Sequence, residues 1–324
     1  MSDNLFGLVN LGNTCYINAS LQVLLSIYEI NNYLQENIVE QKSNDVNLTF
    51  VNEYFDIYNI ISKNKNIIIK PSRYIQNNNI ICKLKNRDEF KPYQQCDSYE
   101  YFIFILEITH NVYNLKENIP SYYRENEELN NYLINYQKKE QSIITNLFLS
   151  VIKYDYYDEN KETILTKKYE GQWFIELIIP PIDKIDIYDC LNYTFKDEFM
   201  CNENSWFDEK ENKKKNVHKI TKISLNPKIL IFPIKRWSNN LKKNNSLIQF
   251  KSHLNISKYS NEPYEDCNYE LFSIINHSGE IFGGHYYSFV KKKKKWFIFN
   301  DNNYKEITQI VKNDNYCLFY RKIK

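Results

Sequence analysis

Apolar residues in the first third of the chain recur at the spacing of an α-helix. Directly after Gly12-Asn13-Thr14, which is typical of a helix start, they stand at Ile17, Leu21, Leu24, Leu25 and Tyr28. Residues 97–109 offer a second segment with one apolar face. The pattern therefore predicts that the chain begins with helices.

From about residue 143 onward, β-branched and aromatic runs replace the helical pattern. They lie at 173–179, 229–237, 269–276, 285–290 and 296–300. The polar stretches 114–140, 202–219 and 239–245 predict loops or insertions. Helices followed by strands, in blocks, predict an α+β fold rather than alternating α/β units.

Composition narrows the class of protein. A chain of 324 residues that is 43% hydrophobic and 16% aromatic has enough apolar surface for a large core. Lys and Arg (42) nearly balance Asp and Glu (40), so bulk charge demands neither a nucleic acid nor a membrane surface as partner. No apolar run approaches the roughly 20 residues that cross a bilayer, and the first four residues open no signal peptide. The seven cysteines include no closely spaced pair, which predicts a reducing compartment, cytoplasmic or nuclear, and neither a cofactor nor a metal.

Cys15 stands at the first turn of the first predicted helix. The positive end of the helix dipole and the unpaired backbone N–H groups favour a thiolate there, which makes Cys15 a candidate nucleophile. A lone cysteine before a helix is also often a small buried residue, and position alone leaves both interpretations open.

A thiol nucleophile needs a general base within reach. Of the five histidines, three lie in settings that predict capping or solvated roles, namely His110, His218 and His253. His277 and His285 remain as candidates. Gly283 and Gly284 precede His285 and would let a substrate backbone pass close to the imidazole, although a simple hairpin turn explains them equally well.

Four segments resemble one known family. Residues 12–22, GNTCYINASLQ, resemble the Cys box of the ubiquitin-specific proteases, and residues 269–290 resemble the His box, where His-x-Gly is followed by Gly-His-Tyr. Residues 296–301, WFIFND, are similar to the family's Trp-x-x-Phe-Asn/Asp-Asp segment, and residues 94–101 resemble its Gln-Gln-Asp-Ala-x-Glu-Phe motif. The resemblance extends from Gly7 to Arg321 and is weak between 114 and 220.

The resemblance implies a set of catalytic residues. Cys15 is implied as the nucleophile and His285 as the base. Asn300 is implied as the residue that orients the imidazole, with Asp301 as the alternative. Asn10 is implied as the donor to the oxyanion, helped by the backbone N–H of Cys15.

The resemblance also implies a surface for the basic, extended Leu-Arg-Gly-Gly tail of ubiquitin. Asp97 and Glu100, spaced i and i+3, lie on one helix face and match positions that bind the tail arginines. Acids that complement the helix dipole are the alternative interpretation. The other implied substrate-binding residues are His277, Gly283, Gly284 and Tyr286.

The implied fold is a single papain-like catalytic domain over residues 1–324. It divides into a helical thumb at about 1–142, fingers and part of the palm at 143–235, and a β-rich palm with the His box at 236–324. Many members of the family carry two Cys-x-x-Cys pairs at the tips of the β-stranded fingers. This chain has Asp208-Glu209-Lys210-Glu211 in place of one pair, so we predict zinc-free fingers held by aromatic packing.

The expected function is that of a deubiquitinating thiol hydrolase, which cleaves the peptide or isopeptide bond after the C-terminal glycine of ubiquitin. One alternative is a protease for another ubiquitin-like modifier. Another is an inactive ubiquitin-binding scaffold, against which the intact Cys15, His285 and Asn300 argue. The expected partners are ubiquitin and ubiquitinated proteins, with no nucleic acid, no membrane and a monomeric chain.

Overall fold

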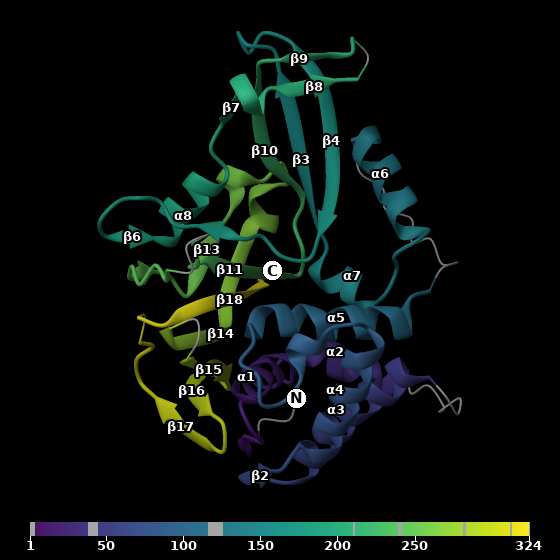
Figure 1. The fold of residues 1–324 in the computed structure, drawn as a ribbon, viewed down its shortest axis with the longest axis vertical. Coiled ribbons are helices and arrows are strands. Elements are labelled where there is room, and N and C mark those ends of the chain that lie inside the picture. The colour runs from purple at the N-terminus through teal and green to yellow at the C-terminus, as the bar shows by residue number, and fades with distance from the viewer. Residues whose placement is uncertain are drawn as a thin grey trace.

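A computed structural model describes residues 4–37, 45–115, 126–209, 211–238, 242–280, 283–311 and 313–323. Helices dominate the N-terminal part and strands the remainder (Figure 1), so the predicted α+β fold is confirmed. The helices are α1 (Cys15–Leu24), α2 (Tyr28–Glu36), α3 (Val46–Lys63), α4 (Ser72–Leu84), α5 (Ser98–Tyr113), α6 (Glu127–Gln137), α7 (Ile143–Phe148) and α8 (Ile187–Thr194). None of these described helices is both long and apolar enough to cross a membrane.

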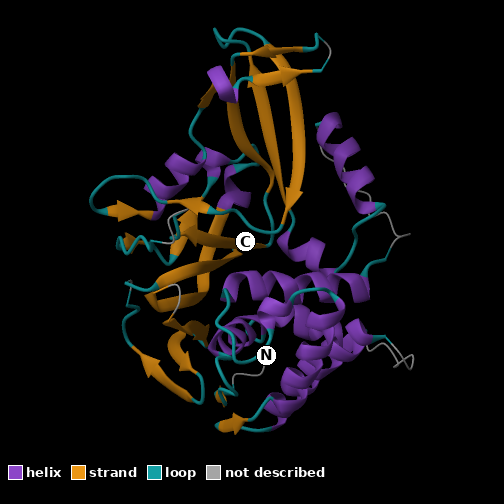
Figure 2. Ribbon diagram, viewed as in Figure 1, coloured by secondary structure: helices purple, strands orange, loops and turns teal. Residues whose placement is uncertain are grey.

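The strands fall into two larger sheets and three short pairs. Their bounds are β1 (Phe6–Leu8), β2 (Ile67–Ile69), β3 (Ser150–Tyr157), β4 (Ile164–Gln172), β5 (Leu177–Ile178), β6 (Ile185–Asp186), β7 (Glu198–Met200), β8 (Trp206–Asp208), β9 (Lys213–Lys215), β10 (Val217–Leu225), β11 (Ile229–Lys235), β12 (Ile248–Gln249), β13 (His253–Asn255), β14 (Asn268–Glu280), β15 (Gly283–Lys292), β16 (Lys295–Asn300), β17 (Asn303–Ile307) and β18 (Asn315–Lys322). Figure 2 shows the helices gathered on one side of the lower half and the strands on the other side and at the top.

Helix α1 lies between the helical layer and the larger sheet because it is apolar around most of its circumference. All of its residues are buried. It packs against α5 on one side and against β15 on the other (Figure 1). A helix that is apolar all round needs neighbours on every face, which explains its central position.

The larger sheet has the strand order β17-β16-β15-β14-β18-β11-β5, with β13 paired to β14. Its neighbouring strands are antiparallel except for β5, which runs parallel to β11. Alternate residues of the central strands pack on opposite faces. Ile275 and Phe319 join the core shared with the helices, whereas Ile274 and Leu318 join a second core. The sheet is therefore buried on both faces at its centre.

A second sheet, β4-β3-β10-β7, projects from the first at the top of Figure 1, with the hairpin β8–β9 near its tip. Helix α6 packs at its base, where Leu129 and Leu133 join Val151 and Leu225 in a small core. The prediction of loops at 114–140 and 202–219 was therefore wrong in part, because these stretches contain α6, β8, β9 and the start of β10. Their few apolar positions among many polar ones carried too little periodic signal. Residues 116–125 and 210 lie outside the described residues.

The tip of this second sheet is joined by ion pairs and stacked rings. Asp208 accepts hydrogen bonds from Nζ of Lys215 (2.7 Å) and from the backbone N–H of Glu211 (3.3 Å). Trp206 stacks on Tyr156 with ring centroids 5.8 Å apart. Across the described ranges, no three His, Cys, Asp or Glu side chains come together as metal ligands. Zinc-free fingers stay a prediction, with these contacts as the interactions that would replace the metal.

We expect the purified protein to contain no stoichiometric zinc and to keep its Tm in a chelator. Trp206→Ala should instead lower the Tm by about 2–4 °C, because an aromatic pair contributes about 1 kcal/mol. Elemental analysis and thermal unfolding with and without 1,10-phenanthroline test both statements. One zinc per chain, together with unfolding on chelation, would contradict them.

Candidate active site

Cys15 is the first residue of α1 and is 5% exposed. The loop before it winds around the side chain of Asn10, whose Oδ1 accepts the backbone N–H groups of Gly12 (3.1 Å) and Thr14 (3.1 Å). Oγ1 of Thr14 accepts the N–H of Leu11 (2.8 Å). These bonds hold the thiol at the N-terminal end of the helix, where the dipole favours an anion.

His285 lies near the start of β15, and Asn300 ends the neighbouring strand β16. Nε2 of His285 and Oδ1 of Asn300 are 2.7 Å apart. Because an amide oxygen only accepts hydrogen bonds, Nε2 carries the proton of this bond and Nδ1 is the ring nitrogen left for the Cys15 thiol. The structure thus brings Asn300 to the imidazole.

The charge state of His285 is set mainly by Cys15. The hydrogen bond with Cys15 raises the pKa of His285 to about 9, partial burial opposes the rise, and the bond to Asn300 and the charge of Asp301 support it. A protonated imidazole beside a thiol is the arrangement in which a cysteine acts as a nucleophile.

Burial keeps other thiols of the chain protonated. It raises the pKa to about 12 at Cys82, Cys96 and Cys190. It also raises the pKa of Cys267 and Cys317. Because the thiolate is the attacking form, these cysteines are poor nucleophiles, and Cys15 is set apart from them by its contact with His285.

Asp301 follows Asn300 in a turn, with a left-handed φ of 51°. Its Oδ1 accepts from Nδ2 of Asn18 (2.8 Å), and its Oδ2 accepts from Nδ2 of Asn10 (3.0 Å). Its backbone oxygen accepts the N–H of Leu8 (2.9 Å). The carboxylate predicted as the alternative orienter of the imidazole therefore bonds to the segment that carries the nucleophile.

The amide of Asn10 retains a donor for an oxyanion. Its Nδ2 has two hydrogens, of which Asp301 accepts one, and its side chain is exposed. Oδ1 is already engaged with the loop before Cys15, so the amide is held with its NH₂ group outward from that loop. Donation to an oxyanion stays a prediction for this residue.

Asn18 is a site residue that the sequence reasoning missed. It is buried on α1, and its Nδ2 donates to Asp301 and to the backbone oxygen of Leu8 (3.2 Å). The available signal was an amide one turn after Cys15 in a largely apolar helix, because a buried amide needs partners.

The two glycines before His285 serve different purposes. A Cβ on Gly284 would stand 2.1 Å from Nε2 of His277, whereas a Cβ on Gly283 would meet nothing within 4 Å. Gly284 is therefore required by internal packing, and room for a substrate backbone at the two glycines stays a prediction. Gln95, also missed, binds the backbone of Gly284 twice, accepting its N–H (3.0 Å) and donating to its carbonyl oxygen (3.3 Å).

His277 and Tyr286, both predicted to bind substrate, are buried. Their rings pack together with centroids 4.6 Å apart, and Tyr286 also contacts Tyr316. Burial, followed by the nearby charge of Lys243, lowers the pKa of His277 to about 4, so its imidazole is neutral. The structure places these rings beneath the site, where they support β14 and β15.

The two acids at the start of α5 differ in their surroundings. Asp97 is the N-cap, and its Oδ1 accepts the N–H groups of Tyr99 (2.8 Å) and Glu100 (3.2 Å). Its Oδ2 accepts the hydroxyl of Tyr316. Burial raises the pKa of both Asp97 and Glu100. Asp97 is thus engaged within the chain, as the helix-capping interpretation predicts, and the exposed Glu100 is the acid that faces solvent.

The remaining histidines have local partners. His110, predicted to be solvated or capping, is buried, and its ring nitrogens contact Ser142 (2.7 Å) and Glu140 (2.6 Å). His218 contacts Asp197 (3.0 Å) in the second sheet, and His253 is exposed on β13.

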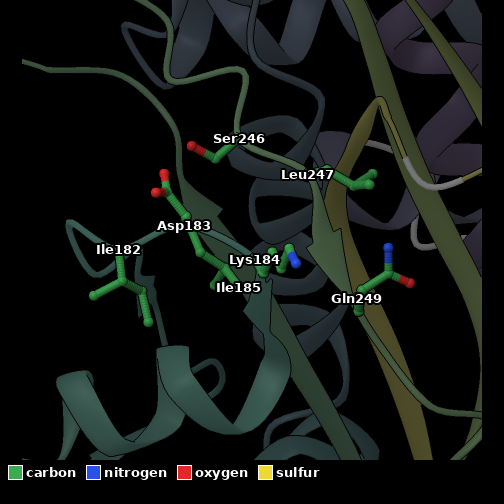
Figure 3. Close-up of a pocket in the computed structure, with 7 residues that line it drawn as sticks. All are labelled: Ile182, Asp183, Lys184, Ile185, Ser246, Leu247 and Gln249. Atoms are coloured by element: carbon green, nitrogen blue, oxygen red, sulfur yellow. The ribbon is translucent and has the colours of Figure 1, made fainter.

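A cavity of about 510 Å³ lies between residues 182–185 and 246–249 (Figure 3). The lining side chains mix exposed apolar groups, such as Ile182 and Leu247, with polar ones, such as Asp183 and Gln249. None of the residues predicted for the site lines it. The cavity is therefore separate from the Cys15 site.

A thiol at a helix N-terminus, an imidazole beside it and an amide behind the imidazole form the site of a cysteine hydrolase. Residues 6–320 match the family model described as ubiquitin carboxyl-terminal hydrolase, and the chain belongs to this family.

Similar proteins share this family. Ubiquitin carboxyl-terminal hydrolase 2 of Homo sapiens is 25% identical over 98% of this chain and 55% of its own length. Ubiquitin carboxyl-terminal hydrolase 5 of Saccharomyces cerevisiae is 25% identical over 99% of this chain and 45% of its own length. The chain thus spans about half the length of these curated relatives.

Solved structures share the fold over the whole chain. The SAGA DUB module with Ubp8 bound to monoubiquitin matches with a TM-score of 0.78 and 22% identity, over 100% of this chain and 71% of the matched chain. The Ubp8 module bound to ubiquitin aldehyde matches with a TM-score of 0.75 and 22% identity, over 100% of this chain and 70% of the matched chain. At this level of identity the likeness establishes the fold alone.

We expect Asn300→Ala to lower the turnover of an amide substrate at least about tenfold, because the imidazole loses the partner that orients it. The alkaline limb of the pH–rate profile should also move. His285 with a pKa of about 9 loses its proton, and the ion pair, as the pH rises through that value. Without the bond to Asn300 this pKa falls, so the limb shifts to lower pH.

Asp301→Ala is the matched control, because it removes the neighbouring side chain that bonds to Asn10 and Asn18. Its limb should shift less than that of Asn300→Ala. A larger shift in the Asp301 variant would mean that the carboxylate is the main partner of the imidazole.

Proposed function

We propose that this chain is a deubiquitinating thiol hydrolase that cleaves the bond after the C-terminal glycine of ubiquitin. The observation that carries the proposal is the contact of Cys15 with His285, which raises the pKa of the imidazole to about 9, together with the 2.7 Å bond from His285 to Asn300. Family membership supports the same reaction class.

In the first half of the reaction, the Cys15 thiolate attacks the carbonyl carbon of the glycine. The carbonyl oxygen becomes an oxyanion, which accepts hydrogen bonds from Nδ2 of Asn10 and from the backbone N–H of Cys15 at the open end of α1. The carbon–nitrogen bond then breaks. The His285 imidazolium gives its proton to the departing amine, which leaves a thioester on Cys15.

In the second half, the neutral imidazole of His285 takes a proton from water. The hydroxide formed attacks the thioester carbonyl, and the carbon–sulfur bond breaks. Ubiquitin leaves with a free carboxyl group, which loses its proton to solvent, and the Cys15 thiolate pairs again with the protonated His285. The bond to Asn300 keeps the ring in one orientation through both proton transfers.

The turn after β16 connects the general base with the donor to the oxyanion. Asn300 aims the base, and the next residue, Asp301, bonds to the amide of Asn10 and to Asn18 on α1. Because the two residues are consecutive, the same short segment holds both the base and the oxyanion donor in place. This geometry preorganises the site, which is a main source of rate enhancement in such reactions.

For the partner, we propose ubiquitin and proteins conjugated to it, bound by a monomeric chain in the cytoplasm or nucleus, with neither a nucleic acid nor a membrane. Two solved structures of the same fold hold monoubiquitin and ubiquitin aldehyde, which supports this partner. The division into thumb (1–142), fingers with part of the palm (143–235) and palm (236–324) belongs to the same proposal. Among the tail contacts, Glu100 and the open face at Gly283 are the candidates that the exposed surface favours.

A vinyl methyl ester of ubiquitin should label the chain once, at Cys15, because this thiol has the base beside it. Cys15→Ala should abolish labelling, and Cys201→Ala, at a cysteine outside the site, should leave it unchanged. Intact-mass spectrometry reads both results. Labelling that survives Cys15→Ala would refute the assignment of Cys15 as the nucleophile. If the same probe made from a related modifier labels the chain faster, that modifier and not ubiquitin is the substrate.

Glu100→Ala should raise KM for a ubiquitin substrate with little change in kcat, because a charge contact to a tail arginine forms before the chemistry. Asp97→Ala should mainly lower stability, by about 1 kcal/mol, because it removes a helix cap. Steady-state kinetics and thermal unfolding separate the two effects. A large loss of kcat in Glu100→Ala with the fold intact would place this acid in the catalytic machinery instead.

A further inference from the structure

Lys243 is a buried cation outside the site described above. It follows β11 in the stretch 239–245, which the sequence predicts as a loop, and is 9% exposed. Its Nζ donates to the backbone oxygens of His277 (2.8 Å) and Gly279 (2.8 Å) and lies 3.0 Å from Nδ1 of His277. An ammonium has three hydrogens, so each of them has an acceptor. Removing a charged group from water costs free energy even when all of its hydrogen bonds are made, so a buried lysine suggests a specific role.

The acceptors of Lys243 flank the strand position that pairs with the catalytic base. In the antiparallel pair β14–β15, Ser278 stands opposite His285, His277 opposite Tyr286, and Gly279 opposite Gly284. The two carbonyl oxygens bound by Lys243 thus belong to the residues on either side of Ser278. The cation fixes the end of β14 where β15 presents His285.

The segment that carries Lys243 is itself anchored. Lys243 pairs with Trp237 in an isolated bridge, and its Nζ lies 5.7 Å from the centroid of the Trp237 ring, which also contacts His277. The buried Arg236 donates to the backbone oxygens of Asn244 (2.8 Å) and Ser246 (3.0 Å). Because the segment that carries Lys243 is itself fixed by these contacts, the ammonium group can fix the positions of its acceptors.

We propose that Lys243 is a positioning residue for His285. It acts through the end of β14, keeping the imidazole at the distance and angle from Cys15 that the ion pair needs, and Gln95 holds the backbone of Gly284 from the other side. The test of this proposal by turnover of a ubiquitin substrate rests on the proposed hydrolase function. The test by alkylation of Cys15 needs only the contact between Cys15 and His285.

The test compares Lys243→Met with Lys242→Met. Lys243→Met keeps an unbranched side chain one heavy atom shorter and removes its donors, whereas Lys242→Met removes the same charge from the exposed neighbouring residue. In Lys243→Met, kcat on a fluorogenic ubiquitin amide should fall at least tenfold while KM stays within about twofold. The pH at which iodoacetamide alkylates Cys15 at half its maximal rate should rise by one unit or more. Lys242→Met should match the wild type in both measurements.

A second variant keeps the test decisive if Lys243→Met does not fold. Lys243→Arg retains charge and donors, whereas Lys243→Gln loses the charge. When the two variants are compared at equal Tm, Lys243→Arg should have the kcat and the alkylation profile closer to wild type. Wild-type kcat and alkylation profile in a folded Lys243→Met or Lys243→Gln variant would overturn the proposal. Equal losses of kcat in Lys243→Arg and Lys243→Gln would also overturn it, because the side chain of Lys243 would then contribute only by filling space in the core. A wild-type chain that alkylates at low pH but does not cleave the ubiquitin amide would refute the proposed function and leave the alkylation test standing.

Discussion

Cys15 and His285 meet because α1 is packed between the helical layer and β15. The helix is buried along its whole length and apolar around most of its circumference, so burial on every side fixes both its position and its rotation. Its N-terminal end then lies where the strand presents the imidazole. The thiol and the base come from opposite ends of the chain, and the hydrogen bond between them raises the pKa of the imidazole to about 9.

The support consists largely of amides and carboxylates that bond to backbone groups. Asn10 shapes the loop before the nucleophile, Asp301 joins that loop to the end of β16, and Gln95 grips the strand at Gly284. Each of these side chains bonds to fixed groups of the loop or strand beside it, so together they specify one arrangement of the nucleophile and the base. The charge on the imidazole is thus stabilised by a site whose geometry is set before substrate arrives.

Beneath the site, a line of buried polar and aromatic side chains connects the two layers. Asp97 caps α5 and accepts the Tyr316 hydroxyl, Tyr316 contacts Tyr286, and Tyr286 packs on His277. The neutral His277 ends the line at Lys243. Residues that resemble substrate contacts in a linear motif therefore serve partly to hold the strand that carries the base.

Local pattern by itself determined the helix that starts at Cys15 and the order of helices before strands, whereas the pairing of His285 with Asn300 was implied by the family resemblance, with Asp301 as the alternative. Each depends on spacing within a few residues, where helical and strand periodicity, or a short motif, places side chains directly. Tertiary structure alone decided the bond from the Tyr316 hydroxyl to Asp97, the packing reason for Gly284 and the contacts of Lys243. These depend on residues such as Tyr316 and His277, which are distant in the chain and come close only when the layers pack. The helix α6 was missed for the same reason, because its apolar face is sparse and is completed only by the strands it covers.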